Sequence, residues 1–317
     1  MSLGNSILGL GASGGAAGGL FVAAGAGTYN AAYSADGINW TGVTDSGIAA
    51  LNYCYGVSSF NGNFWIVGYN GTNYKLFHST DAINWTERTN PQPAPPNSAL
   101  TNVFCDGIRL YVIGYRTYYT TDLTASGGWT EATNSDFNNY GESMTYTGQN
   151  WILTGRGVPV IKYSTNGTSF TDVTTPRILF NALGVSSNGA GVVVAAGYDG
   201  SRVASSTNHG VTWSNITTSG SVGYGSYWDG TNFHADVQGG SYYRSPDGIS
   251  FTSYTKPLSN RIEEMASNGT VLVAAGSGTS TLTYSTNGGT SWNPLGTSMF
   301  STAYGITCMG DPNIARP

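Results

Sequence analysis

The stretch YSADGINW, from Tyr33 to Trp40, decides the fold because variants of it recur along the 317-residue chain. HSTDAINW, YSTNGTSF, SSTNHGVTW, RSPDGISF and YSTNGGTSW follow it, and TTDLTASGGW is a longer copy. A repeat of fixed period, here about 42 residues, indicates a repeat architecture. Aligned on the final aromatic residue, the seven copies end at Trp40, Trp85, Trp129, Phe170, Trp213, Phe251 and Trp292.

A second element keeps the same period. Asn-Gly or Asp-Gly pairs precede apolar runs in NGNFWIVGY, DGIRLYVIGY and NGTVLVAAG. Such pairs favour tight hairpins because both turn positions need positive φ. Each repeat therefore supplies four antiparallel strands, which is one propeller blade. The sequence predicts an all-β, seven-bladed propeller over residues 18–317. A β-solenoid is the competing interpretation, but its coils are shorter and would not alternate two hairpin signals.

The repeated stretch resembles the Asp-box, or bacterial neuraminidase repeat, whose pattern is Ser/Thr-x-Asp-x-Gly-x-Thr/Ser-Trp. The resemblance covers roughly residues 20–295. It implies a turn between the third and fourth strands of each blade, on the face opposite any site. Its carboxylate or amide can accept backbone N–H groups two residues on, and its aromatic ring can cover the hairpin, so the role is structural. The matching residues are Ser34, Asp36, Trp40, Ser79, Asp81, Trp85, Asp122, Trp129, Ser164, Asn166, Phe170, Ser206, Asn208, Trp213, Ser245, Asp247, Phe251, Ser285, Asn287 and Trp292.

Composition argues against several partners. Charged residues make up 9% of the chain, and 12 Lys+Arg stand against 17 Asp+Glu, which gives little support to binding of nucleic acid or anionic lipid. The apolar N-terminal stretch lacks the basic segment of a signal peptide and an unbroken run of about 20 apolar residues, so we expect no membrane insertion. Three scattered cysteines and three scattered histidines predict neither a metal site nor a cofactor.

The sequence offers no catalytic set. The resemblance to sialidases implies an arginine ahead of the first repeat, but the first arginine is Arg88. Glu142, Glu263 and Glu264 fall in predicted inner strands, and strand alternation leads us to expect that one of the last two lines the central channel. We therefore predict a non-enzymatic protein. A glycoside hydrolase of the sialidase-like superfold remains the alternative, because fold alone does not exclude it.

Binding residues are expected on the loops opposite the repeated turns. These loops, at 68–75, 114–119, 155–160 and 197–202, and the connections before the next blades combine tyrosine with Asn, Asp and Arg. Aromatic faces stack on sugar rings, and polar side chains hydrogen-bond hydroxyl groups. Polar edge loops in a tyrosine-rich chain are the plainer interpretation. The candidate ligand-binding residues are Tyr69, Tyr115, Arg116, Tyr140, Arg156, Tyr198, Asp199 and Arg202.

Low charge, abundant Gly, Ser, Thr and Asn, and the missing export signal favour a structural or adhesive module on a particle surface. We predict a phage virion protein of the tail or capsid surface, made in the host cytoplasm. Its expected partners are other virion or surface-assembly proteins, with host-surface glycan as the candidate ligand. A bacterial cell-surface protein and an assembly scaffold are the alternatives.

Eight segments resemble an inner strand, one more than seven blades need. ILGLGAS at 7–13 and TAYGITCMGD at 302–311 compete for the first blade. A ring closed by strands from both ends leaves no open edge, which favours the C-terminal segment beside LFVAAG. Residues 1–17 are then an N-terminal arm; the reverse assignment stays open.

Overall fold

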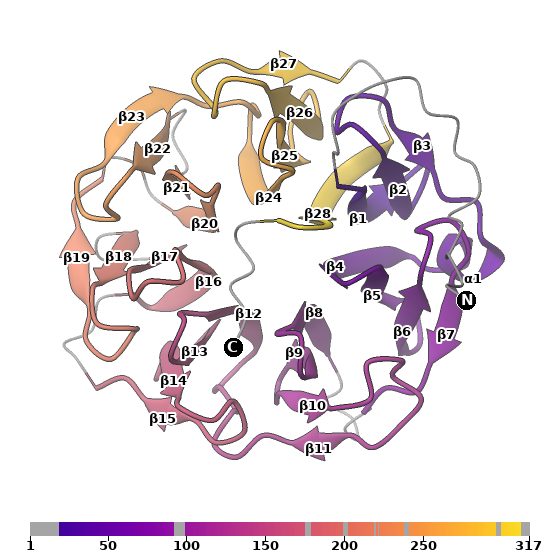
Figure 1. Cartoon of the computed structure of the whole chain (residues 1–317), viewed down its shortest axis with the longest axis horizontal. Coiled ribbons are helices and arrows are strands. Elements are labelled where there is room, and N and C mark those ends of the chain that lie inside the picture. Colours follow the sequence, from indigo (N-terminus) through magenta and orange to yellow (C-terminus); the bar gives the residue numbers. More distant parts are fainter. Residues whose placement is uncertain are drawn as a thin grey trace, which may run out of the picture.

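The computed structural model describes residues 19–91, 99–174, 179–198, 202–218, 220, 222–237, 241–295 and 299–311. Within them, seven four-stranded antiparallel sheets stand around a central axis as a seven-bladed β-propeller, as predicted (Figure 1). One short helix, α1 (Ser46–Ala49), lies between the first two blades and was not predicted.

From the inner strand outward, the blades are β28 (Phe300–Cys308), β1 (Phe21–Gly27), β2 (Ala31–Ser34) and β3 (Thr41–Gly42); β4 (Tyr53–Phe60), β5 (Asn63–Tyr69), β6 (Tyr74–Ser79) and β7 (Thr86–Arg88); β8 (Leu100–Cys105), β9 (Leu110–Gly114), β10 (Tyr118–Thr120) and β11 (Thr130–Glu131); β12 (Gly141–Tyr146), β13 (Trp151–Gly155), β14 (Ile161–Ser164) and β15 (Thr171–Asp172); β16 (Asn181–Ser187), β17 (Val193–Tyr198), β18 (Val203–Ser206) and β19 (Ser214–Ile216); β20 (Gly223–Trp228), β21 (Phe233–Val237), β22 (Ser241–Ser245) and β23 (Thr252–Thr255); β24 (Arg261–Ser267), β25 (Leu272–Ser277), β26 (Leu282–Ser285) and β27 (Asn293–Pro294).

The core lies between blades. Each second strand is buried on both faces because a neighbouring blade packs on each side, which explains why most of these strands are apolar. His234 and Asp236 in β21 are buried exceptions. In β1, Phe21 and Ala23 belong to one hydrophobic cluster, while Val22 and Ala24 belong to the next. Successive side chains of a strand point to opposite faces, so one strand serves two interfaces.

The repeated turns share one set of hydrogen bonds. In the first, Asp36 Oδ1 accepts from the backbone N–H groups of Ile38 and Asn39 at 2.8 and 2.7 Å, and Ser34 Oγ donates to the same oxygen at 2.9 Å. Asn208 is the equivalent of Asp36 in the fifth copy, where its Oδ1 accepts from Thr212 N and Ser206 Oγ, both at 2.9 Å. An amide oxygen therefore replaces a carboxylate oxygen in this turn.

The ring closes through the two ends of the described chain. β28 pairs antiparallel with β1, with Cys308 opposite Phe21, and so occupies the inner position of the first blade. The predicted closure by strands from both ends is confirmed. The predicted arm at residues 1–17 lies outside the described residues.

Every inner strand carries a β-bulge at an equivalent position, near the end that faces away from the repeated turns. In β4 the register jumps between Cys54 and Gly56, which leaves Tyr55 unpaired with the second strand. Equivalent shifts occur in the other six inner strands. A bulge bends the strand and re-aims one side chain. The bulge residues are Tyr55, Thr101, Glu142, Leu183, Tyr224, Glu263 and Tyr304.

Glycine opposite the bulge makes this geometry possible. In β17, a Cβ on Gly197 would lie 1.9 Å from the carbonyl oxygen of Asn181, and a Cβ on Gly276 in β25 would lie 2.0 Å from that of Arg261. No side chain fits at such distances. In the blade of β20–β23 this place is taken by Val237, which pairs with Gly223, so here the inner strand supplies the glycine.

Candidate functional site

The central recess opens on the face away from the repeated turns. Inner strands begin at this face, because the hairpins that follow them lie on the same side as the turns. The seven inner strands surround the central axis (Figure 1). A cavity of about 370 Å³ occupies the recess, and residues of all seven inner strands line it. All seven bulge residues line it. The bulges thus deliver one side chain from each blade to one ring.

The bulge corrects one prediction. Glu263 and Glu264 were expected to point to opposite sides of their strand, yet both line the recess. The register shift between Ile262 and Glu264 breaks the strict alternation of the strand, so adjacent side chains reach the same space.

One arc of the recess mouth is aromatic. The ring of Tyr55 lies 5.7 Å from Tyr304, 5.9 Å from Tyr53 and 6.2 Å from Tyr74, measured between ring centroids. Tyr74 continues outward to Tyr69 at 4.9 Å. Tyr53 is 39% exposed. The five rings form a connected path from the recess to the outside, defined here as the tyrosine path.

Charged residues line two other parts of the recess, in the blades of β12–β15 and β24–β27. Arg156 Nε contacts a carboxylate oxygen of Glu142, and Arg261 Nε lies 2.5 Å from Glu263 Oε1. The guanidinium of Arg261 also lies over the ring of Tyr224, 5.2 Å from its centroid. Arg156 is therefore held by a carboxylate on a neighbouring strand, and Arg261 by one two residues along the same strand. A guanidinium carries five N–H donors, so each arginine has donors besides its Nε.

Burial raises the pKa of the recess carboxyl groups. Desolvation raises the pKa of Glu142, and the charge of Arg156 opposes it. The pKa of Glu263 is raised to about 7 by desolvation, against the effect of Arg261. Desolvation raises the pKa of Glu264 to about 8, while a hydrogen bond accepted by its Oε2 from Ile306 N at 3.0 Å opposes the rise. Carboxyl groups of the recess therefore include proton donors near neutral pH.

Asp311 lines the recess. Its Oδ1 accepts from the Tyr227 hydroxyl at 2.8 Å, and its Oδ2 accepts from Ser267 N at 3.2 Å. Tyr227 lies on β20 and Ser267 on β24, so Asp311 joins the closing strand to two other blades.

The predicted ligand residues fall into two groups. Tyr140, Arg156 and Tyr198 line the recess. Tyr69 lies on the tyrosine path. Tyr115, Arg116 and Arg202 are not among the lining residues, and Arg116 pairs with Glu131 at 2.8 Å. Asp199 lies outside the described residues.

Sequence reasoning missed Tyr55, Tyr224, Tyr304 and Arg261. A signal was present, since each of these three tyrosines directly precedes a glycine in an inner strand: Tyr55-Gly56, Tyr224-Gly225 and Tyr304-Gly305. Aligning the inner strands with one another, in addition to the turns, would have placed them in one ring.

The described ranges contain no group of three or more His, Cys, Asp or Glu side chains placed to hold a metal ion. No helix in the same ranges has the length and apolar character needed to cross a membrane.

No protein-family model and no curated protein sequence matches the chain. Solved structures are similar in fold. A streptogramin B lyase structure aligns with a TM-score of 0.65 and 15% identity over 80% of this chain and 86% of that one. The structure of YCF48 bound to D1 peptide aligns with a TM-score of 0.60 and 13% identity, over 81% of this chain and 90% of that one. A putative 6-phosphogluconolactonase from Bacteroides uniformis aligns with a TM-score of 0.61 and 9% identity, over 92% of this chain and 99% of that one. These likenesses support the propeller fold alone.

Proposed function

We propose that this propeller is a non-enzymatic binding module whose central recess holds a glycan. The ring of bulge residues carries the proposal. At this one position the blades present different side chains: three tyrosines, two glutamates, a threonine and a leucine. A purely structural position in a repeat protein has no reason to vary in this way.

The chemistry of the mouth suits a polyhydroxylated ring. Tyrosine faces offer stacking surface at small entropic cost, and the paired Arg156 and Arg261 offer fixed N–H donors to hydroxyl groups. The carboxylates of Glu142 and Glu263 accept from hydroxyl groups when ionised. The recess volume of about 370 Å³ lies within the range typical of small-ligand pockets.

The biological setting belongs to the same proposal. We place the protein among Asp-box propellers and on the surface of a particle, with a phage tail or capsid as the expected location and a bacterial surface as the alternative. The support is the repeated turn and the composition. YCF48 was solved with a bound peptide, so a peptide is the competing ligand class that the experiment must separate.

A glycan array probed with the full chain, followed by calorimetry on the best binder, tests the proposal. Changing Tyr55 and Tyr304 together to Ala should weaken binding about tenfold or more, because two stacking surfaces are lost. Tyr115→Ala is the matched control, since Tyr115 is a half-buried tyrosine outside the recess lining. Equal affinity of the double variant and the wild type would contradict the proposal. Binding of peptides and of no glycan would show that the ligand is a peptide.

A glycoside hydrolase is the second candidate. The observation in its favour is the raised pKa of Glu263 in a pocket that also holds the Glu142 carboxyl, since a protonated carboxyl beside a second carboxyl is the usual machinery for glycoside cleavage. Incubating the glycans with the protein and analysing released sugars decides the matter. Turnover that is lost in Glu263→Gln and kept in Tyr115→Ala would establish the enzyme.

A further inference from the structure

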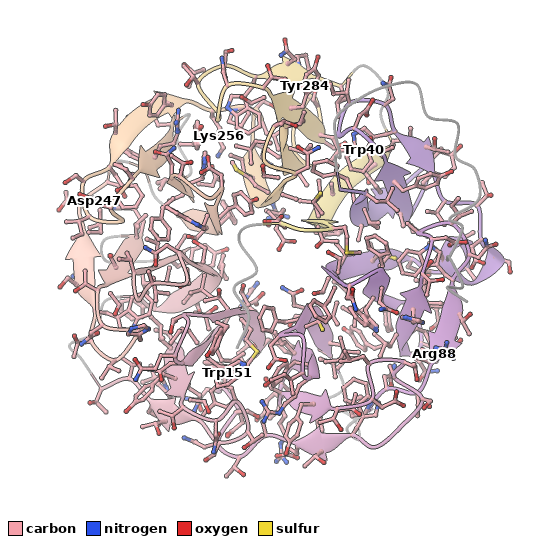
Figure 2. All side chains as sticks on the ribbon, viewed as in Figure 1. Trp40, Arg88, Trp151, Asp247, Lys256 and Tyr284 are labelled. Atoms are coloured by element: carbon pink, nitrogen blue, oxygen red, sulfur yellow. The ribbon has the colours of Figure 1, made fainter. Side chains whose placement is uncertain are left out.

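Two lysines of the chain are buried, and they differ in their partners. Lys162 is 2% exposed, and its Nζ lies 2.7 Å from Asp172 Oδ1, on a carboxylate that is 43% exposed. Lys256, labelled in Figure 2, is 4% exposed, and its Nζ lies 2.8 Å from Asp236 Oδ1, on a carboxyl that is 1% exposed. The first pair reaches water through its carboxylate. The second is enclosed on both sides.

Asp236 is an acidic residue at a second-strand position where most blades place an apolar residue and β13 places Thr154. It lies on the second strand β21 opposite Tyr242, and the equivalent positions in β17 and β25 hold Ala196 and Ala275. Its Oδ2 accepts from Ile262 N at 2.9 Å. Its Oδ1 and Lys256 Nζ are in contact, yet neither atom has a hydrogen-bond partner with acceptable angles. The amine thus approaches the carboxyl away from the direction that a hydrogen bond needs.

Burying Lys256 and Asp236 as an ion pair costs free energy. Removing two charges from water costs several kcal/mol each, and their attraction offsets this when the geometry is good and the remaining polar atoms are bonded. Burial raises the pKa of Asp236 to about 6, although Lys256 opposes the rise. A neutral product of the same two groups would carry no such cost.

We propose that Lys256 and Asp236 condense into an intramolecular isopeptide bond. The lone pair of Nζ attacks Asp236 Cγ, a C–N bond forms, and one C–O bond breaks. The ammonium gives up two protons, the departing carboxylate oxygen takes them, and one water leaves. No oxidant, reductant or other reactant is needed.

The surroundings provide for the water and the protons. A cavity of about 10 Å³ is lined by both Asp236 and Glu264, which is close to the space that one water molecule requires. The Glu264 carboxyl lines the same cavity on the side of Asp236 and can take up or supply a proton there. The amide would tie the residue after β23 to β21, across β22, and so staple three strands of one blade.

Mass spectrometry of the purified full chain tests the proposal. The intact protein should be lighter than its sequence by one water molecule, and digestion should yield a branched peptide that joins Lys256 to Asp236. Lys256→Arg should restore the full mass, because a guanidinium does not form this bond. Lys162→Arg is the matched control and should keep the loss of water.

Asp236→Asn sharpens the result. The same attack on an amide releases ammonia, so this variant should be lighter than its own sequence by one ammonia molecule. A wild-type protein of full mass, with residues 236 and 256 recovered in separate unmodified peptides, would overturn the proposal. This outcome is read on the wild type and does not depend on whether any variant folds.

Discussion

The two faces of the propeller use the same repeat in opposite ways. On one face, the turns between third and fourth strands hold nearly the same residues in every blade, and Asp36 and Asn208 make equivalent bonds. On the other face, seven bulges at equivalent positions present different side chains to one recess. The uniform turns are therefore structural, and the varied bulge residues are the positions that the proposed function assigns to binding.

Removal of residues 300–317 should have the largest effect, because it deletes the closing strand. Phe300, Ala303 and Ile306 belong to the cluster between the first and last blades, and β1 would become an open edge. We expect loss of the cooperative unfolding transition in calorimetry. Deleting residues 1–17 is the control and should leave the melting temperature nearly unchanged. Retention of a sharp transition without β28 would show that the ring does not depend on its seam.

Gly197→Ala tests whether the bulge of one blade requires the glycine opposite it. The added Cβ would lie 1.9 Å from Asn181 O, so the inner strand must move, and we expect a loss of about 2–4 kcal/mol in the free energy of unfolding. Gly127→Ala meets nothing within 4 Å and serves as the control in the same urea titration. Equal stability of the two variants would mean that the bulge tolerates a side chain and does not define the recess.

The turns with aspartate should respond to acid, and those with asparagine should not. Burial by itself would raise the pKa of Asp36, but hydrogen bonds from Asn39, Ile38 and Ser34 outweigh it and lower the pKa from 3.8 to about 2. The pKa values of Asp81, Asp122 and Asp247 are also lowered to about 2. A carboxyl with a lowered folded-state pKa contributes stability that is present above pH 4 and is lost as the pH falls toward 2.

Changing these four aspartates to Asn should therefore lower the free energy of unfolding at pH 7, because hydrogen bonds to a charged acceptor are lost, and should flatten its fall between pH 4 and pH 2. Urea unfolding at several pH values measures this. The reverse variant Asn166→Asp should add acid sensitivity. An unchanged pH profile in the fourfold variant would assign the acid response to other carboxyl groups.

Leu183→Ala should have the smallest effect on the fold, since Leu183 is a bulge residue that lines the recess and belongs to none of the hydrophobic clusters between blades. We expect a change within about 0.5 kcal/mol in the free energy of unfolding. Ligand affinity measured by calorimetry should nevertheless change. A large loss of stability with unchanged binding would show that the ring of bulge residues is structural.

The fold was predictable from the sequence because its signals are local. Asn-Gly turns, apolar second strands and an in-phase Ser34–Trp40 motif each report on a few neighbouring residues. The recess was predictable in part. Arg156 and Tyr140 were found from loop composition, but Glu263 and Glu264 were misassigned because a bulge is set by pairing with another strand. Tyr304 and Tyr55 come from blades far apart in the sequence, so their contact depends on the closed ring.

The seam between β1 and β28 also bears on how fast the protein forms. Ser301 Oγ donates to Ala26 O, a contact that spans 275 positions of the sequence. Closing so long a loop costs little more free energy than closing a medium one, since the entropy grows with the logarithm of length. The folding rate depends more strongly on the sequence separation of the paired strands, because non-local pairing slows folding. A circularly permuted chain in which β28 directly precedes β1 would make this pairing local, and it should refold faster while its equilibrium stability stays nearly the same.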